Sequence, residues 1–227
     1  MNRRFLTETG LLLLLLAGVT ALLALTGSDI AVSSSCYIGG GWPIGERFPW
    51  KLLYRIDRIP AVMLASIGLV AIICGYFNHK WRYLVRPGLF LVLLLAIGPG
   101  LVVNTIFKDH WGRPRPRELV EFGGVRQFQQ PWQPGIAGKG RSFPSGHSSA
   151  AFYLSAPYFI YRYRRPRLAR VWFAGGAVFG VAMSYARIAQ GAHFLTDTVW
   201  AFGMVWLVAL ILSAFLIRDD GNTVLEP

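Results

Sequence analysis

The sequence is poor in charged residues. Only 15% of its 227 residues are Asp, Glu, Lys or Arg, whereas 54% are hydrophobic. A soluble domain of this size would carry about 25% charged residues. Acidic residues are the scarcest, with 11 Asp and Glu against 23 Lys and Arg, which leaves a net charge of +12. The shortage of charge argues against a soluble domain. Nucleic acid is not expected as a partner, because the chain has no separate basic domain to bind it.

Cysteine and histidine are also rare, with two and four residues respectively. Cys36 lies after the first long apolar run and Cys74 lies inside the second run, so we do not expect a disulfide between them. Three of the four histidines, His110, His147 and His193, lie in stretches that also contain arginines. These three histidines are therefore the first candidates for functional residues.

Long apolar runs are abundant. A helix needs about 20 mostly apolar residues to cross the hydrocarbon core of a bilayer. Six runs are candidates, of which the fourth is the shortest: Phe5–Leu25, Ala61–Phe77, Gly88–Phe107, Ser148–Tyr161, Val171–Ala186 and Val199–Ile217. We predict an all-α polytopic membrane protein, a six-helix bundle in which residues 1–227 form a single domain.

The orientation follows from the basic residues. The segments "MNRR", "NHKWRYLVRP" and "RYRRPRLAR" are short and rich in Lys and Arg, which places them in the cytoplasm by the positive-inside rule. "MNRR" with the first apolar run also resembles a secretory signal peptide. The run is long for that and lacks a clear small-x-small site, so we predict an uncleaved anchor, with cleavage as the alternative. We expect a bacterial inner-membrane protein whose other loops face the periplasm or exterior.

The outer loops carry more cations than the positive-inside rule explains. The segment "GERFPWKLLYRIDRIP" (45–60) mixes aromatic, apolar and basic residues at helical spacing, which predicts an amphipathic helix lying along the interface. The other outer cations gather in three stretches together with histidines. These residues are Lys108, Arg113, Arg115, Arg117, Arg141 and Arg187, with His110, His147 and His193. Arginine forks and a lysine ammonium suit the oxygens of a phosphate dianion.

The stretch "PSGHSS" begins the fourth apolar run. Pro144 and Gly146 allow a tight turn, and the N–H groups near Ser145 would stand at a helix N-terminus, which attracts anions. His147 would then lie beside a bound anion and exchange a proton near neutral pH. The alternative is a helix cap with an incidental histidine.

His193 and Asp197 are four residues apart, so on a helix they share one face. A carboxylate at Asp197 can accept the Nδ1 proton of His193 and leave Nε2 free as a nucleophile. The alternative is a structural hydrogen bond that pins the sixth helix. Taken alone, the pair does not decide between these two interpretations.

The three stretches taken in order are specific. Six residues separate Lys108 from Arg115-Pro116, and "PSGH" occupies 144–147. Five residues separate Arg187 from His193, and three more separate His193 from Asp197. This pattern resembles the tripartite signature of the phosphatidic acid phosphatase type 2 superfamily, which includes bacterial acid phosphatases and vanadium haloperoxidases. The motifs span 108–116, 144–147 and 187–197. The chain departs from the family at Ala186, where a serine is usual, and so lacks one hydroxyl donor.

The resemblance implies a role for each matching residue. His193 would attack phosphorus to form a phosphohistidine, and Asp197 would hold it. His147 would protonate the leaving oxygen and then activate water. The phosphoryl oxygens would be held by Lys108, Arg115, Ser145, the Gly146 N–H and Arg187.

No metal or other cofactor is expected, because the acidic residues of the outer loops, Asp109, Glu118, Glu121 and Asp197, form no cluster that would hold Mg²⁺. Two residues of the first motif stay outside this scheme. Arg113 either grips a second phosphate or stiffens its turn, of which we favour the second, and His110 is expected to be interfacial or supporting.

An active site at the outer membrane boundary favours an amphiphilic substrate whose tails stay in the bilayer. Phosphatidic acid, phosphatidylglycerol phosphate, undecaprenyl pyrophosphate and lipid A phosphates all remain candidates. The Gly- and Gln-rich loop Phe122–Gly140 is expected to form a lid or access region. Two other functions are weighed against hydrolysis: phosphotransfer from lipid to lipid, and binding or transport of a lipid phosphate without chemistry. The second would not need two histidines and an aspartate.

Overall fold

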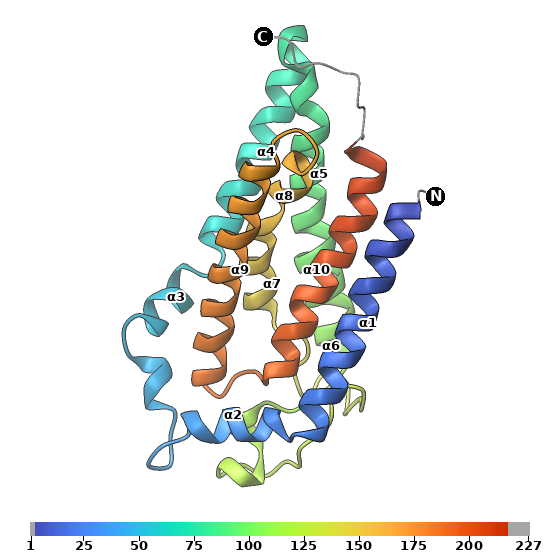
Figure 1. Ribbon diagram of the computed structural model, residues 1–227. Helices are drawn as coiled ribbons and strands as arrows, with labels where there is room; N and C mark the ends of the chain where they lie inside the picture. Colours follow the sequence, from blue (N-terminus) through green and yellow to red (C-terminus); the bar gives the residue numbers. More distant parts are fainter. Residues whose placement is uncertain (1–2, 218–227) are drawn as a thin grey trace.

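The computed structural model describes residues 3–217 and is built from helices, with no strand among those residues. Five helical stretches in this part of the chain are long and apolar enough to cross a membrane: Arg3–Leu25, Trp50–Phe77, His79–His110, Pro166–Ala189 and Leu195–Leu216. The stretches run roughly side by side, and α1 (Arg3–Leu25) begins at the same end of the bundle at which α10 (Leu195–Leu216) finishes (Figure 1). The predicted all-α membrane bundle is therefore confirmed.

The fourth predicted run is not one continuous α-helix. It consists of α7 (Gly146–Phe152), the 3₁₀ turn η6 (Tyr153–Ser155) and α8 (Pro157–Tyr161). Pro157 has no N–H to donate to a preceding carbonyl, which favours the break at this point. The segment runs between α5 (Val85–Leu95) and α9 (Pro166–Ala189) along the bundle (Figure 1). It still occupies the place expected of a fourth helix.

The third long stretch changes its winding before it reaches the outer loops. After α5, the segment η3 (Ala96–Phe107) is a π-helix with Pro99 inside it. Pro99 cannot donate, and the side chain of Asn104 donates to the Pro99 carbonyl at 2.7 Å. A π-helical insertion places extra residues in a turn and occurs often near functional sites. Here it leads directly into α6 (Lys108–His110), which begins at the lysine of the first motif.

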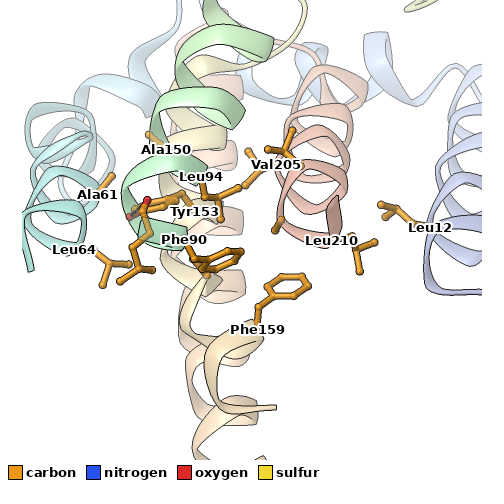
Figure 2. Packing of buried hydrophobic residues seen from close by; sticks show 14 of the residues in the cluster. Leu12, Ala61, Leu64, Phe90, Leu94, Ala150, Tyr153, Phe159, Val205 and Leu210 are labelled. Carbon is orange, nitrogen blue, oxygen red and sulfur yellow. Dashed lines mark hydrogen bonds between the residues drawn. The ribbon is translucent and has the colours of Figure 1, made fainter. Parts of the chain in front are cut away.

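A cluster of buried apolar side chains joins most of the long helices, as Figure 2 shows from close by. Phe90 of α5 and Phe159 of α8 meet with their ring centroids 6.0 Å apart, and the Tyr153 hydroxyl donates to the Leu91 carbonyl at 3.0 Å. Val205 and Leu210 of α10 and Leu12 of α1 extend the cluster. The cluster holds α7 and α8 in register with their neighbours and so fixes where α7 begins.

The outer end of the bundle is more structured than the sequence predicts. The segment after α1 forms a helix, α2 (Ser28–Cys36), which lies across the end of the bundle (Figure 1). It is followed by η1 (Pro43–Glu46), α3 (Trp50–Ile56) and then α4 (Ile59–Phe77). The connection between α4 and α5 is the turn η2 (His79–Leu84), and two short turns, η4 (Pro116–Glu118) and η5 (Val120–Phe122), follow α6. The serine-rich α2 has no apolar periodicity, so its pattern does not mark it as a helix.

The predicted interfacial helix is found at α3, but it is shorter than 45–60 and has a protein partner. It packs against α9, and the Trp50 ring meets the Tyr185 ring edge-on at 4.6 Å. Phe48, just before it, remains 81% exposed. One side of this segment therefore faces outward, as an interfacial helix should, and the other side rests on the bundle.

A buried ion network ties the outer elements together, with Arg113 at its centre. The Arg113 guanidinium donates to Asp29 of α2 at 2.8 Å and to Asp197 of α10 at 2.5 Å. It also donates to the Thr196 hydroxyl and to the Gln129 carbonyl, both at 2.9 Å. Its side chain is fully buried, and so are those of its acidic partners.

The network decides between the two interpretations of Arg113. Its donors are occupied by carboxylates and a carbonyl, and no solvent reaches the guanidinium. A grip on a second phosphate is therefore excluded in this conformation. Arg113 does more than stiffen its own turn, because it joins α2, the loop after α6 and the start of α10.

Removal of Arg113 should destabilise the protein strongly. Arg113→Met keeps much of the side-chain volume but leaves the carboxylates of Asp29 and Asp197 buried without their cation. Breaking a buried ion pair by removing one partner costs about 3–5 kcal/mol. Unfolding of the purified protein in detergent measures the loss, with the exposed Arg117→Met as the matched control. Equal stability of the two variants would show that the network does not support the fold.

Candidate active site

The three motifs meet at one end of the bundle. Lys108 begins α6, Ser145 caps α7, Arg187 lies in the last turn of α9, and Asp197 lies in the first turn of α10. Backbone hydrogen bonds lock these segments together: Ser145 N–H donates to the Asp197 carbonyl at 3.1 Å, and Ala192 N–H donates to the Arg187 carbonyl at 3.1 Å. The eight residues expected in the site are thus held by a rigid frame.

The start of α7 needs glycine at position 146. A Cβ there would collide with the side-chain oxygen of Asn104 and would stand 3.0 Å from the Lys108 ammonium. Only glycine lets the α7 backbone approach these two groups so closely. Ser145 is the N-cap of α7, and its hydroxyl accepts from the Ser148 N–H at 3.3 Å. The Ser145 hydroxyl is buried and also contacts the Ser148 hydroxyl at 2.8 Å. The geometry agrees in part with both interpretations of "PSGHSS". Ser145 forms a helix cap, as the structural interpretation expects, and the cap lies beside the Lys108 ammonium, as an anion site requires.

His193 is completely buried, just before α10. Its Nδ1 lies 2.6 Å from the Ser142 carbonyl, whereas the nearer oxygen of Asp197 is 3.7 Å away. A carbonyl only accepts, so Nδ1 carries the proton. His193 Nε2 is then the nitrogen with a free lone pair, and it is a buried atom without a hydrogen-bond partner in the described structure.

Asp197 takes part in this arrangement indirectly. Its Oδ2 accepts from the Ser142 hydroxyl at 2.5 Å and from the Phe194 N–H at 2.7 Å. Asp197 therefore positions Ser142, whose carbonyl holds His193, and it also fixes the backbone beside His193. The sequence predicts a direct bond from Asp197 to Nδ1, and the structure places the Ser142 carbonyl there instead. The tautomer that results is the same.

Burial lowers the pKa of His193 to about 4, although the nearby Asp197 carboxylate opposes the shift. Burying an ionisable group in a weakly polar environment disfavours its charged form. At neutral pH the imidazole is therefore uncharged, as a nucleophilic nitrogen must be.

Three cations surround the two histidines. The charges of Arg115 and Arg187 act on Lys108, and those of Lys108 and Arg187 act on both His147 and His193. Lys108 and Arg187 are buried, and the Nε of Arg187 is a further buried atom without a hydrogen-bond partner. The Arg187 guanidinium also donates to the side-chain carbonyl of Gln190. Buried cations that face each other without a shared carboxylate suit an anion bound between them.

His147 meets two residues of the α3 region that the motif pattern does not include. Its Nε2 lies 3.2 Å from a carboxylate oxygen of Asp57, and its ring stacks on Tyr54 with centroids 5.4 Å apart. The Arg187 guanidinium lies 4.7 Å from the centre of the same Tyr54 ring. The sequence gives one indication that Asp57 has a specific role: it is the single acidic residue within the basic stretch "YRIDRI".

The other residues considered from the sequence are His110, Ala186 and the loop Phe122–Gly140. His110 is exposed, with Nδ1 at 2.8 Å from the Ile106 carbonyl. Ala186 is fully buried, so the family's missing hydroxyl is replaced by a packed methyl group. The loop Phe122–Gly140 packs beside the first motif: the Pro131 carbonyl accepts from the Trp111 ring at 2.9 Å. The segment that covers His147 and Arg187 is α3, not this loop.

An open depression of about 490 Å³ adjoins the site. Gln190 connects the two, because its carbonyl oxygen accepts from Arg187 and its amide donates to the Gly45 carbonyl at 3.1 Å. The depression is lined by Ile38, Gly39, Gly41, Trp42, Pro43, Glu46, Arg117 and Gln190. It combines an aromatic ring, planar polar groups and charges of both signs.

Comparisons with known proteins identify relatives of this chain. A Lipid A 4'-phosphatase of Francisella tularensis subsp. novicida is 33% identical over 168 residues, which cover 73% of this chain and 75% of that protein. A Phosphatidylglycerophosphatase B of Bacillus subtilis is 26% identical over 213 residues, which cover 90% and 91% respectively.

A solved structure has the same fold. It is the transmembrane PAP2 type phosphatidylglycerolphosphate phosphatase from Bacillus subtilis, with a TM-score of 0.58, 21% identity, and coverage of 93% of this chain and 98% of that one. The PAP2 superfamily as a whole matches residues 87–219, which include all three motifs. The resemblance drawn from the motifs is therefore confirmed: the chain belongs to the PAP2 superfamily and is a multi-pass membrane phosphatase.

Proposed function

We propose that this enzyme hydrolyses the phosphomonoester of an amphiphilic glycolipid of the lipid A type, through a phosphohistidine on His193 and without a metal cofactor. The observation that carries the proposal is the His193 Nε2 lone pair. It is buried and without a partner, its ring is neutral, and it lies among the charges of Lys108 and Arg187. A phosphoryl group between these cations would give the buried Nε of Arg187 the acceptor that it lacks and would offset the charge of Lys108.

The first step forms the phosphoenzyme. Nε2 of His193 donates its lone pair to phosphorus while the bond from phosphorus to the ester oxygen breaks on the opposite side. His147 gives a proton to that oxygen, so the lipid leaves as an alcohol. The positive charge that develops on His193 is stabilised through Nδ1–H by the Ser142 carbonyl and, at longer range, by Asp197. Phosphoryl transfer depends mainly on such positioning and charge stabilisation.

The second step uses the same groups in reverse. His147, now neutral, takes a proton from water, and the water oxygen attacks phosphorus. The bond between phosphorus and Nε2 breaks, its electron pair returns to His193, and inorganic phosphate leaves. Lys108, Arg115 and Arg187, with the Gly146 N–H and the Ser145 hydroxyl, are assigned to hold the phosphoryl oxygens in both steps. Burial and nearby cations lower the pKa of His147 in the empty site, and the incoming phosphate dianion opposes this shift.

The donor set of the site suits fixed cations better than a bound metal. Among residues 3–217, no group of three His, Cys, Asp or Glu side chains is arranged to hold a metal ion. Two arginines and one lysine would neutralise the equatorial oxygens, a task that metal ions perform in other phosphoryl-transfer enzymes.

The depression beside Arg187 supports a sugar headgroup. Trp42 offers an aromatic surface, and Glu46, Arg117 and Gln190 offer planar hydrogen-bonding groups. Such a mixture suits a polyhydroxylated ring better than a second phosphate, which would call for cations alone. The relative that acts on lipid A is also more similar to this chain than the phosphatidylglycerophosphatase, at 33% against 26% identity.

A panel of lipid phosphates tests the proposal. The purified enzyme should release inorganic phosphate from lipid A with a higher kcat/KM than from phosphatidic acid, phosphatidylglycerol phosphate or undecaprenyl pyrophosphate. Release should persist in EDTA and be inhibited by vanadate, and His193→Ala should abolish it. No release from any lipid would refute the proposed function, and loss on chelation restored by Mg²⁺ would refute the metal-free site. Labelled phosphate that appears on an acceptor lipid would assign phosphotransfer instead.

Substitutions of His147 and His193 should differ in how their effect on activity depends on the leaving group. His147→Ala removes the proton donor, a role worth roughly 10²–10⁴-fold for a lipid alcohol. An activated aryl phosphate leaves without that proton, so this variant should give a rapid burst of aryl alcohol and then stall as phosphoenzyme. Rapid-mixing absorbance measures the burst, and His193→Ala is the control that should give none. A burst from His193→Ala instead would exchange the assigned roles.

The active site is proposed to face the periplasm or exterior. A reporter that is active only outside the cytoplasm should therefore work when inserted between residues 122 and 140, and it should fail between residues 162 and 170. These insertions lie on opposite ends of the bundle, so they form a matched pair. The opposite pattern of activity would reverse the orientation and place the site in the cytoplasm.

A further inference from the structure

We propose that Asp57, at the end of α3, is a positioning residue for His147: it holds Nε2, so that Nδ1 is the nitrogen that carries the proton to the leaving oxygen. The proposal rests on the function proposed above, and it adds a residue from outside the three motifs. The distance from Nε2 to the Asp57 carboxylate is 3.2 Å, and both side chains are 17% exposed.

The carboxylate of Asp57 is itself held in place. Its other oxygen, Oδ1, accepts from the Arg58 N–H at 2.6 Å, and the Arg58 side chain approaches Oδ2 at 3.5 Å. Tyr54, one helical turn earlier, stacks on the His147 ring and limits its rotation. The α3 segment thus fixes both the plane of the imidazole and the nitrogen that faces the carboxylate.

The charges around His147 make this contact important. The cations of Arg187, Lys108 and Arg58 all oppose its protonation. Among residues 3–217, Asp57 is the carboxylate in ion-pair contact with His147. Five other acidic residues of this end pair with other cations: Asp29 and Asp197 with Arg113, Asp109 with Arg141, Glu118 with Arg126, and Glu46 with Lys51, while no ion pair in the described part of the chain joins the exposed Glu121 to His147.

The contact also settles the direction of proton transfer. A carboxylate accepts, so Nε2 keeps its proton toward Asp57 in both states of the ring. In the first step the Nδ1 proton passes to the leaving oxygen, and in the second step Nδ1 takes a proton from water. The imidazolium is stabilised by the adjacent carboxylate, which is the way an acid-base histidine is usually oriented.

The test uses Asp57→Asn, with Asp57→Glu as the conservative variant and the exposed Asp109→Asn as the matched control. Asp57→Asn should lower kcat with the lipid phosphate by about tenfold or more, with little change in KM. It should leave the burst with an activated aryl phosphate nearly unchanged, because that leaving group needs no proton. Asp57→Glu should recover part of the lost kcat, and Asp109→Asn should behave as the wild type.

A double-mutant cycle with His147→Ala distinguishes positioning from a general structural effect. If Asp57 acts through His147, the double variant should be no slower than His147→Ala alone. An Asp57→Asn variant with wild-type kcat on the lipid would overturn the proposal. An equal loss in the rate of the aryl burst, or a further loss in the His147→Ala background, would also overturn it. Failure of the proposed function is a separate result, since the wild type would then release no phosphate at all.

Discussion

The Arg113 guanidinium is the group on which the outer end of this protein depends. It is fully buried and binds Asp29 from α2 and Asp197 from α10. Asp197 in turn accepts from Ser142, whose carbonyl lies against His193. A buried cation between two carboxylates is tolerated only where all three find their partners. The same contacts that hold these elements together therefore orient His193, the proposed nucleophile.

The active site itself has an excess of positive charge that the protein does not neutralise. Lys108 and Arg187 are buried, and Arg187 retains a donor without a partner. Such an arrangement costs free energy in the empty enzyme, and the proposed binding of a phosphoryl group would offset that cost. Burial also keeps His193 uncharged, so its lone pair is ready when the substrate arrives. The buried cations therefore lower the stability of the empty enzyme and favour the binding of an anion.

The α3 segment links this site to the membrane boundary. One side carries exposed apolar and basic residues, and the other presents Tyr54 and Asp57 to His147. Tyr54 also lies against Arg187, so α3 contacts one of the cations that are proposed to hold the phosphate. His147, the proposed proton donor, and the helix that contacts it are thus parts of one local structure.

The sequence by itself determined the helical membrane class, the positions of the five long helices and the residues of the three motifs. Apolar run length and short motif spacing are local properties, so they can be read from one chain. Only the tertiary structure decided which polar groups meet. Asp29 and Thr196 are 167 residues apart, and Arg113 lies 84 from Asp197. Asp57 lies outside the three motifs and far along the chain from His147, and α2 has no apolar periodicity that marks it as a helix. The pairing of buried charges depends on how the helices pack, because each must find a partner that the packing brings within reach.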